Sequence, residues 1–127
     1  MSETASVVLT ALAEFRAKPK FRFTEAQFRL LNPSPESVTA PLVAALDGCA
    51  SQLSSLVESK APSSALRQAI SRSLRSVDKP TDTEDREYLA YYYHELGQMV
   101  GVSIAPVLNT WLYGPFLGFL LRVFNRA

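Results

Sequence analysis

The segment from Thr81 to Gly114 constrains the fold of this chain more than any other. Its first part carries apolar or tyrosine side chains at steps of three and four residues, which place them along one side of an α-helix. This stripe comprises Leu89, Tyr92, Tyr93, Leu96, Met99 and Val100. A helix with one apolar side needs another surface to cover it, so the segment predicts a packed helical domain.

Capping residues predict both ends of this helix. The spacing Thr81-x-x-Glu84 indicates a capping box at its start, in which the hydroxyl and the carboxylate accept hydrogen bonds from free amide groups. Gly101 predicts its end, because glycine adopts the left-handed conformation that closes a helix without a steric penalty. Ser103 is a suitable cap for a second helix over residues 104–113.

Helical periodicity recurs along the rest of the chain. The predicted helices cover residues 38–59, 65–77, 84–100, 104–113 and 115–125, with additional ones near 2–18 and 24–31. The helix over 38–59 carries an apolar seam formed by Leu42, Leu46, Cys49, Leu53 and Leu56. Pro41 is expected in its first turn, where a missing amide removes no helical hydrogen bond. We predict a single all-α domain over residues 1–127, a compact bundle of about five to seven helices.

Residues 18–24 are predicted to be an extended linker. Pro19 ends the first helix, because proline disfavours helical geometry in the residue before it. The residues from Lys20 to Phe23 then alternate polar and apolar side chains as a strand does, but no second strand is evident. We expect the phenylalanines of this linker to fasten it to the core.

Composition excludes several classes of protein. The chain has 127 residues, of which 47% are hydrophobic and 20% charged, and its net charge is +1. These values are typical of a globular domain and leave no global field that would hold a nucleic acid. Cys49 is the only cysteine, so an intramolecular disulfide is impossible. The polar N-terminus lacks the pattern of a secretory signal, and we expect a cytoplasmic protein.

Basic and acidic residues occupy consecutive segments. No acid occurs between Lys60 and Val77, whereas five acids follow between Asp78 and Glu87. One interpretation is that the two helices lie antiparallel, or that their ends meet, and that their opposite charges partly neutralise one another. The other is that the exposed arginines contact an anion or an acidic partner, and the residues concerned are Arg67, Arg72 and Arg75.

The sequence from His94 to Gln98 is the nearest approach to a catalytic motif. A zinc protease helix needs a second histidine where this chain has Gln98, and His94 is the only histidine. Cys49 lies on an apolar seam, where burial is expected to raise its pKa. We therefore predict no metal, no cofactor and no catalytic residue. The polar side of this helix is the candidate for ligand or partner contact, through Tyr91, His94, Glu95 and Gln98.

The C-terminal quarter is unusually apolar. From Leu96 to Leu121 the only ionisable side chain is that of Tyr113, and this length would suffice to cross a bilayer. Glycines, prolines and unpaired polar groups within it favour separate packed helices instead. We expect a helix over 115–127 that forms part of the core or an oligomer interface, with a membrane surface as the alternative. The contact residues would be Phe116, Phe119, Leu120 and Phe124.

The order of features in the C-terminal half resembles a small uncharacterised bacterial family. These features are the acidic run from Asp82 to Asp85, the tyrosine-rich helix, Gly101 and the sequence from Trp111 to Gly114. The resemblance covers residues 81–114 and implies a compact helical domain of unknown function.

These observations favour a noncatalytic, cytoplasmic protein-interaction domain that self-associates through its apolar C-terminal helix. Two alternatives stay open. One is a membrane-peripheral or membrane-anchored protein that uses residues 115–125. The other is a small-ligand binder or enzyme around Tyr91, His94 and Gln98.

Overall fold

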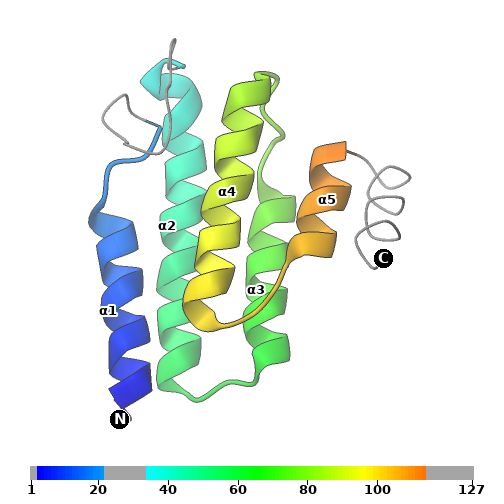
Figure 1. The fold of residues 1–127 in the computed structure, drawn as a ribbon. Coiled ribbons are helices and arrows are strands. Elements are labelled where there is room, and N and C mark those ends of the chain that lie inside the picture. The colour runs from blue at the N-terminus through cyan, green and yellow to red at the C-terminus, as the bar shows by residue number, and fades with distance from the viewer. Residues whose placement is uncertain (1–2, 22–33, 114–127) are drawn as a thin grey trace.

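The computed structural model describes residues 3–21 and 34–113 (Figure 1). These ranges contain five α-helices and no strand. The helices are α1 (Glu3–Ala17), α2 (Glu36–Glu58), α3 (Ser63–Ser76), α4 (Thr83–Val100) and α5 (Ala105–Tyr113). The prediction of an all-α fold is confirmed. The helices predicted near 24–31 and over 115–125 lie outside the part that the structure describes.

Helices α1 to α4 form a bundle in which each helix runs antiparallel to the next (Figure 1). Helix α4 packs against all four other helices, while α2 packs against α1, α3 and α4. Helix α5 lies at the edge of the bundle on the side away from α1. The tyrosine-rich helix is therefore the central element of the described fold.

The core follows the predicted apolar stripes. From the seam of α2, Leu42, Leu46, Cys49 and Leu53 are buried, and Leu56 is half-buried. Tyr92 and Tyr93 are the largest fully buried side chains. Burial of a large aromatic side chain contributes several kcal/mol of stability, so the two tyrosines are major determinants of the fold.

Two helices occupy the described part of the uncharged stretch that begins at Leu96. Helix α4 ends at Val100 and α5 begins at Ala105, so the predicted division into two helices is confirmed. Among the helices described, α2 alone is long and apolar enough to cross a membrane by length and composition. In the bundle its seam packs against three other helices.

The left-handed end of α4 is confirmed. Gly101 has φ of 77°, and its amide donates to Gln98 O at 3.2 Å. The Val102 amide donates to Gly97 O at 2.9 Å, which completes a Schellman motif. Helix α5 begins at Ala105, one residue later than predicted, and the Ser103 hydroxyl accepts a hydrogen bond from the Ala105 amide at 3.4 Å.

The predicted cap at the start of α4 is wrong by one residue. Asp82, not Thr81, is the N-cap, and its carboxylate accepts a hydrogen bond from the Asp85 amide at 3.1 Å. Aspartate is a stronger N-cap than threonine, and the same three-residue spacing is available one position later. Asp85 is itself buried and accepts a hydrogen bond from the Ser34 hydroxyl at 2.5 Å.

Helix α2 begins earlier than predicted. Pro35 is its N-cap, and the carbonyl of Pro35 accepts hydrogen bonds from the Val38 and Thr39 amides at 2.8 and 3.2 Å. These bonds nucleate the helix upstream of Pro41, which lies inside α2 beyond the first turn. The Ser37 carbonyl therefore has no helical amide donor at position 41.

Candidate functional site

The predicted polar side of α4 forms and lies at the surface of the bundle. Tyr91, His94 and Gln98 are exposed on the helix, whereas Glu95 is half-buried. Both carboxylate oxygens of Glu95 accept hydrogen bonds from Lys18, at 2.7 and 2.9 Å. None of five grooves on the described surface is lined by any of these four α4 residues.

Potential metal ligands are dispersed. Across residues 3–21 and 34–113, no group of three or more His, Cys, Asp or Glu side chains could hold a metal ion. Glu95 is occupied by Lys18, and His94 is exposed. The resemblance of this helix to a zinc protease motif therefore stops at its sequence.

The three candidate arginines of α3 point to different neighbours. Arg67 Nε donates to the Ser103 carbonyl at 3.2 Å. Arg75 lines a groove between α3 and α5, whereas Arg72 lines a groove formed with α2. The structure thus places Arg67 and Arg75 beside α5 and its preceding loop, whereas Arg72, one helical turn from Arg75, lines the groove with α2.

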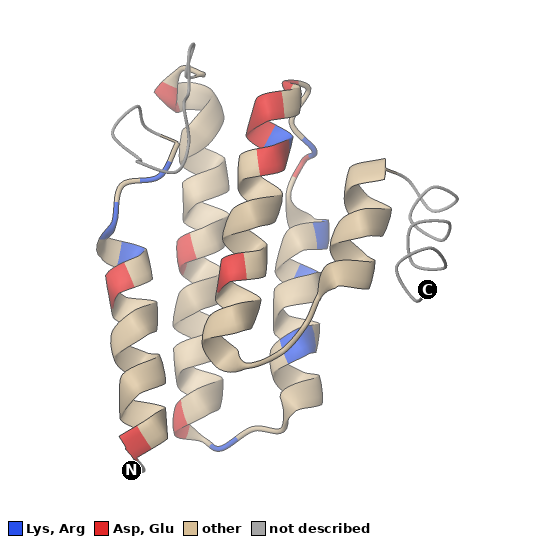
Figure 2. Ribbon diagram, in the orientation of Figure 1, with Lys and Arg blue, Asp and Glu red and all other residues tan. Residues whose placement is uncertain are grey.

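Charge pairing between α3 and α4 does not occur as expected. The two helices are antiparallel, and the basic residues of α3 and the acids at the start of α4 are visible in Figure 2. Within the described residues, the ion pairs join Lys18 to Glu95 and Lys20 to Asp47 instead. The predicted antiparallel arrangement is confirmed, but within the described residues no ion pair joins an arginine of α3 to an acid of α4.

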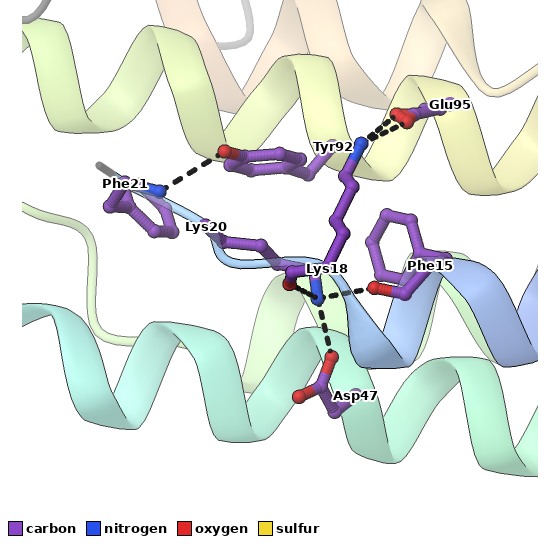
Figure 3. Close-up of polar contacts among 7 residues, drawn as sticks. All are labelled: Phe15, Lys18, Lys20, Phe21, Asp47, Tyr92 and Glu95. Carbon is purple, nitrogen blue, oxygen red and sulfur yellow. Dashed lines mark hydrogen bonds and ion pairs between the residues drawn. The ribbon is translucent and has the colours of Figure 1, made fainter. Parts of the chain in front are cut away.

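A lysine cluster that the sequence did not reveal links α1, α2 and α4 (Figure 3). It comprises Lys18, Lys20, Asp47 and Glu95. The side chain of Lys20 is fully buried, and its ammonium lies 2.9 Å from Asp47 Oδ1. The same ammonium donates to the carbonyls of Phe15 at 2.6 Å and Lys18 at 3.2 Å. All three donor positions of Lys20 are therefore occupied.

Aromatic rings enclose this cluster. Lys20 Nζ lies 4.4 Å from the Phe15 ring centroid, and Lys18 Nζ lies 5.4 Å from the centroids of Phe15 and Tyr92. Such cation–π contacts contribute about 0.5 to 2 kcal/mol each, depending on desolvation. The tyrosine hydroxyl accepts a hydrogen bond from the Phe21 amide at 3.1 Å. The rings and the ion pairs thus fasten the end of α1 to both α2 and α4.

Phe21 corrects the prediction of an extended linker. Its φ is 61°, in the left-handed region that costs a non-glycine residue about 1 kcal/mol or more. Its side chain is buried and packs edge-on against Tyr92 at 5.2 Å between ring centroids. The expected fastening of Phe21 to the core is confirmed, but the backbone turns there. Residues 22–24 lie outside the described range.

The surroundings of Lys20 suit a structural role and not a catalytic one. A catalytic lysine needs a neutral amine with space for a substrate carbonyl. Lys20 instead has a carboxylate and two carbonyls around a buried ammonium. Its burial has no sequence signal, because the partners are far apart in the chain and only tertiary packing brings them together.

A second polar group lies between α2, α3 and α4. The hydroxyls of Ser73 and Tyr93 are 2.8 Å apart, and the Ser73 hydroxyl also donates to the Ala45 carbonyl at 3.4 Å. Burial raises the pKa of Cys49 to about 11, although a hydrogen bond with Ser73 opposes this. Burial likewise raises the pKa of Tyr93 to about 12. The expected raised pKa of Cys49 is confirmed, and neither group is a nucleophile near neutral pH.

The raised pKa of Cys49 leads us to expect a loss of stability at alkaline pH. The thiol ionises near its ordinary pKa of 9.0 in the unfolded chain but near 11 in the native state. The native state binds more protons in this window. The contribution of the Cys49 thiol to the free energy of unfolding is therefore fully present below about pH 9. It is lost between about pH 9 and 11, by at most about 1.4 kcal/mol per pH unit. Urea midpoints should fall more steeply with pH for the wild type than for Cys49→Ala. Parallel pH profiles of the two proteins would contradict the assignment.

The groove between α3 and α5, which we call the α3–α5 groove, has a volume of about 250 Å³. It is lined by Arg75, Pro106, Val107, Thr110 and Trp111. A separate groove of about 380 Å³ lies between α2 and the loop from α3 to α4. The predicted contact residues Phe116, Phe119, Leu120 and Phe124 lie outside the described residues.

Residues 3–116 match the family DUF4844, a domain of unknown function. The chain belongs to this family. The DUF4844 match extends well beyond residues 81–114, so the predicted membership of an uncharacterised family is confirmed, while a bacterial origin stays a prediction. No curated protein and no solved structure matches this DUF4844 chain.

Proposed function

We propose that this protein is a noncatalytic, cytoplasmic and bacterial protein-interaction domain. It self-associates through the apolar segment that follows α5. The observation that carries the noncatalytic part is the state of the ionisable groups that the fold brings together. Each is held by a neighbour or kept protonated by burial, so none is available for proton transfer or nucleophilic attack near neutral pH.

The polar side chains buried in the described part of the chain are also satisfied. No buried side-chain nitrogen or oxygen there lacks a hydrogen-bond partner. Active sites commonly retain an unsatisfied or strongly perturbed polar group facing a cleft. The buried ammonium of Lys20 is satisfied. Cys49 lines the groove beside Arg72, but burial raises its pKa to about 11, so the thiol stays protonated near neutral pH. This arrangement favours a structural role for these groups.

The position of α5 supports self-association. This helix has no charged residue, lies at the bundle edge and ends at Tyr113, which is 52% exposed. The sequence continues with eight uncharged residues, 114–121, that include Phe116 and Phe119. A large apolar surface on a soluble domain requires cover. A second copy of the chain supplies such cover with matching chemistry.

Light scattering after size-exclusion chromatography tests this proposal. We expect the mass of the wild type to rise from monomer to dimer between about 10 μM and 1 mM, as mass action requires. The double variant Phe116→Ser/Phe119→Ser should remain monomeric. Val7→Ser is the matched control, because Val7 is 64% exposed on α1, far from α5, and should not alter the mass. A wild type that stays monomeric at every concentration would remove self-association.

Flotation with anionic liposomes separates this proposal from the membrane alternative. The segment 115–127 combines phenylalanines with Arg122 and Arg126, which would suit an anionic lipid surface. Under the self-association proposal the protein stays with the soluble fraction. Flotation that is abolished by Phe116→Ser/Phe119→Ser would establish the membrane function instead.

A further inference from the structure

The α3–α5 groove combines a free cation with an aromatic wall. Arg75 is exposed, and among the described residues its guanidinium has neither a hydrogen bond nor an ion pair. Trp111 is half-buried and forms the opposite wall together with Val107. An arginine beside an aromatic ring and an aliphatic side chain is a common composition of partner-binding surfaces.

A second cation reinforces this surface. Lys79, in the loop between α3 and α4, donates a hydrogen bond to the Trp111 carbonyl, and its ammonium lies 5.3 Å from the Trp111 ring centroid. The cation also complements the negative C-terminal end of α5. Lys79 is exposed, so it retains donors for a ligand beyond the one used on the carbonyl.

The charges around the groove are unbalanced. Helix α5 has no acid, and α3 has arginines but no acid in its sequence. The acid nearest in sequence is Asp78, which precedes Lys79 in the loop and lines the groove on the α2 side. The described ion pairs lie at the lysine cluster, on the other side of α4. Arg75 and Lys79 therefore meet the solvent as cations beside an apolar surface.

We infer that the α3–α5 groove binds an acidic segment of a partner protein. An apolar side chain of that segment packs on Trp111 and Val107, while its carboxylates pair with Arg75 and Lys79. The inference rests on the proposed interaction role but not on self-association. A protein segment fits better than a nucleic acid, because the groove is short and the net charge of the chain is only +1.

Trp111 makes this inference directly measurable, since it is the only tryptophan of the chain. The probe is a synthetic peptide of about ten residues with one leucine among glutamates and aspartates. We expect a saturable change in Trp111 emission that weakens as salt rises, because the paired charges are near solvent. Calorimetry on the same samples measures binding independently of the emission. Replacing the leucine of the peptide with serine should weaken binding.

Two charge reversals on opposite sides of the bundle provide the matched comparison. Arg75→Glu should weaken peptide binding at least about tenfold, because it opposes the carboxylates at the groove. Arg16→Glu makes the same change in net charge on α1, across the bundle from α5, and should alter binding less than about twofold. Circular dichroism shows whether each variant retains the fold. Equal weakening by both variants would indicate a diffuse charge effect and overturn the inference.

The other outcomes of the binding experiments also test the acidic-partner site. No binding by either emission or calorimetry would overturn the inference. So would tighter binding of a single-stranded oligonucleotide, or displacement of the peptide by an equal concentration of inorganic phosphate. A monomeric protein that binds the peptide would remove self-association and leave the acidic-partner site standing. A dimeric protein that does not bind the peptide would remove the acidic-partner site and leave self-association standing.

Discussion

Replacing Lys20 with methionine should lower the free energy of unfolding by about 3 kcal/mol. The change removes a fully buried ammonium and leaves the Phe15 carbonyl and Asp47 without this donor. Breaking a buried ion pair from one side costs about 3 to 5 kcal/mol. We expect the lower end, because the side chain of Asp47 is 32% exposed and water can partly solvate it. Urea denaturation followed by circular dichroism measures the change.

Lys18→Met is the matched control for this prediction. Lys18 also pairs with a carboxylate, but its side chain is 33% exposed, so its loss should cost only about 1 kcal/mol. The double variant Lys20→Met/Asp47→Leu should recover part of the loss, because no unpaired charge then remains at the site. A Lys20→Met protein as stable as Lys18→Met would show that the buried ammonium does not fasten α1 to the bundle.

Replacing Gly97 with alanine should destabilise the protein by about 2 kcal/mol. A Cβ at this position would lie 2.8 Å from the Val102 carbonyl oxygen, so the turn between α4 and α5 would have to move. Overpacking of this kind costs about 1 to 3 kcal/mol, against a gain of up to about 1 kcal/mol from alanine's helix propensity. Thermal and urea unfolding of the variant measure the net effect.

Gly48→Ala should have the opposite sign. Gly48 lies inside α2, and a Cβ there would meet nothing within 4 Å. The variant should be more stable by up to about 1 kcal/mol, because alanine favours the helix. Equal effects of the two substitutions would mean that the close approach of Val102 to α4 does not determine the response.

The helices were predictable because their signals are local. The seam of α2 and the stripe of α4 repeat over several turns, and Gly101 closes α4 by its own conformation. The errors at helix starts were choices between neighbouring caps. Asp82 competes with Thr81 at the same spacing, and Pro35 starts α2 ahead of Pro41. Such choices depend on small differences in capping energy.

The polar interior was not predictable. Lys20, Asp47 and Asp85 resemble ordinary surface charges in the sequence, since charged residues are rarely buried. Their positions follow from tertiary packing, which brings Lys20 against α2 and Asp85 against Ser34. The candidate site could not be predicted from the sequence for the same reason. The α3–α5 groove needs Arg75 and Trp111 side by side, although 36 positions separate them in the chain.

The most direct test of the interaction-domain account is the environment of residue 121 in the absence of lipid. In a Cys49→Ala background, Leu121→Cys provides a single site for a solvent-sensitive fluorophore and leaves the proposed contact residues Phe116 and Phe119 in place. If a second copy covers this segment, the emission should shift to the blue as the protein concentration rises through the dimerisation range. Water-like emission at every concentration, or a blue shift that requires liposomes, would contradict the account.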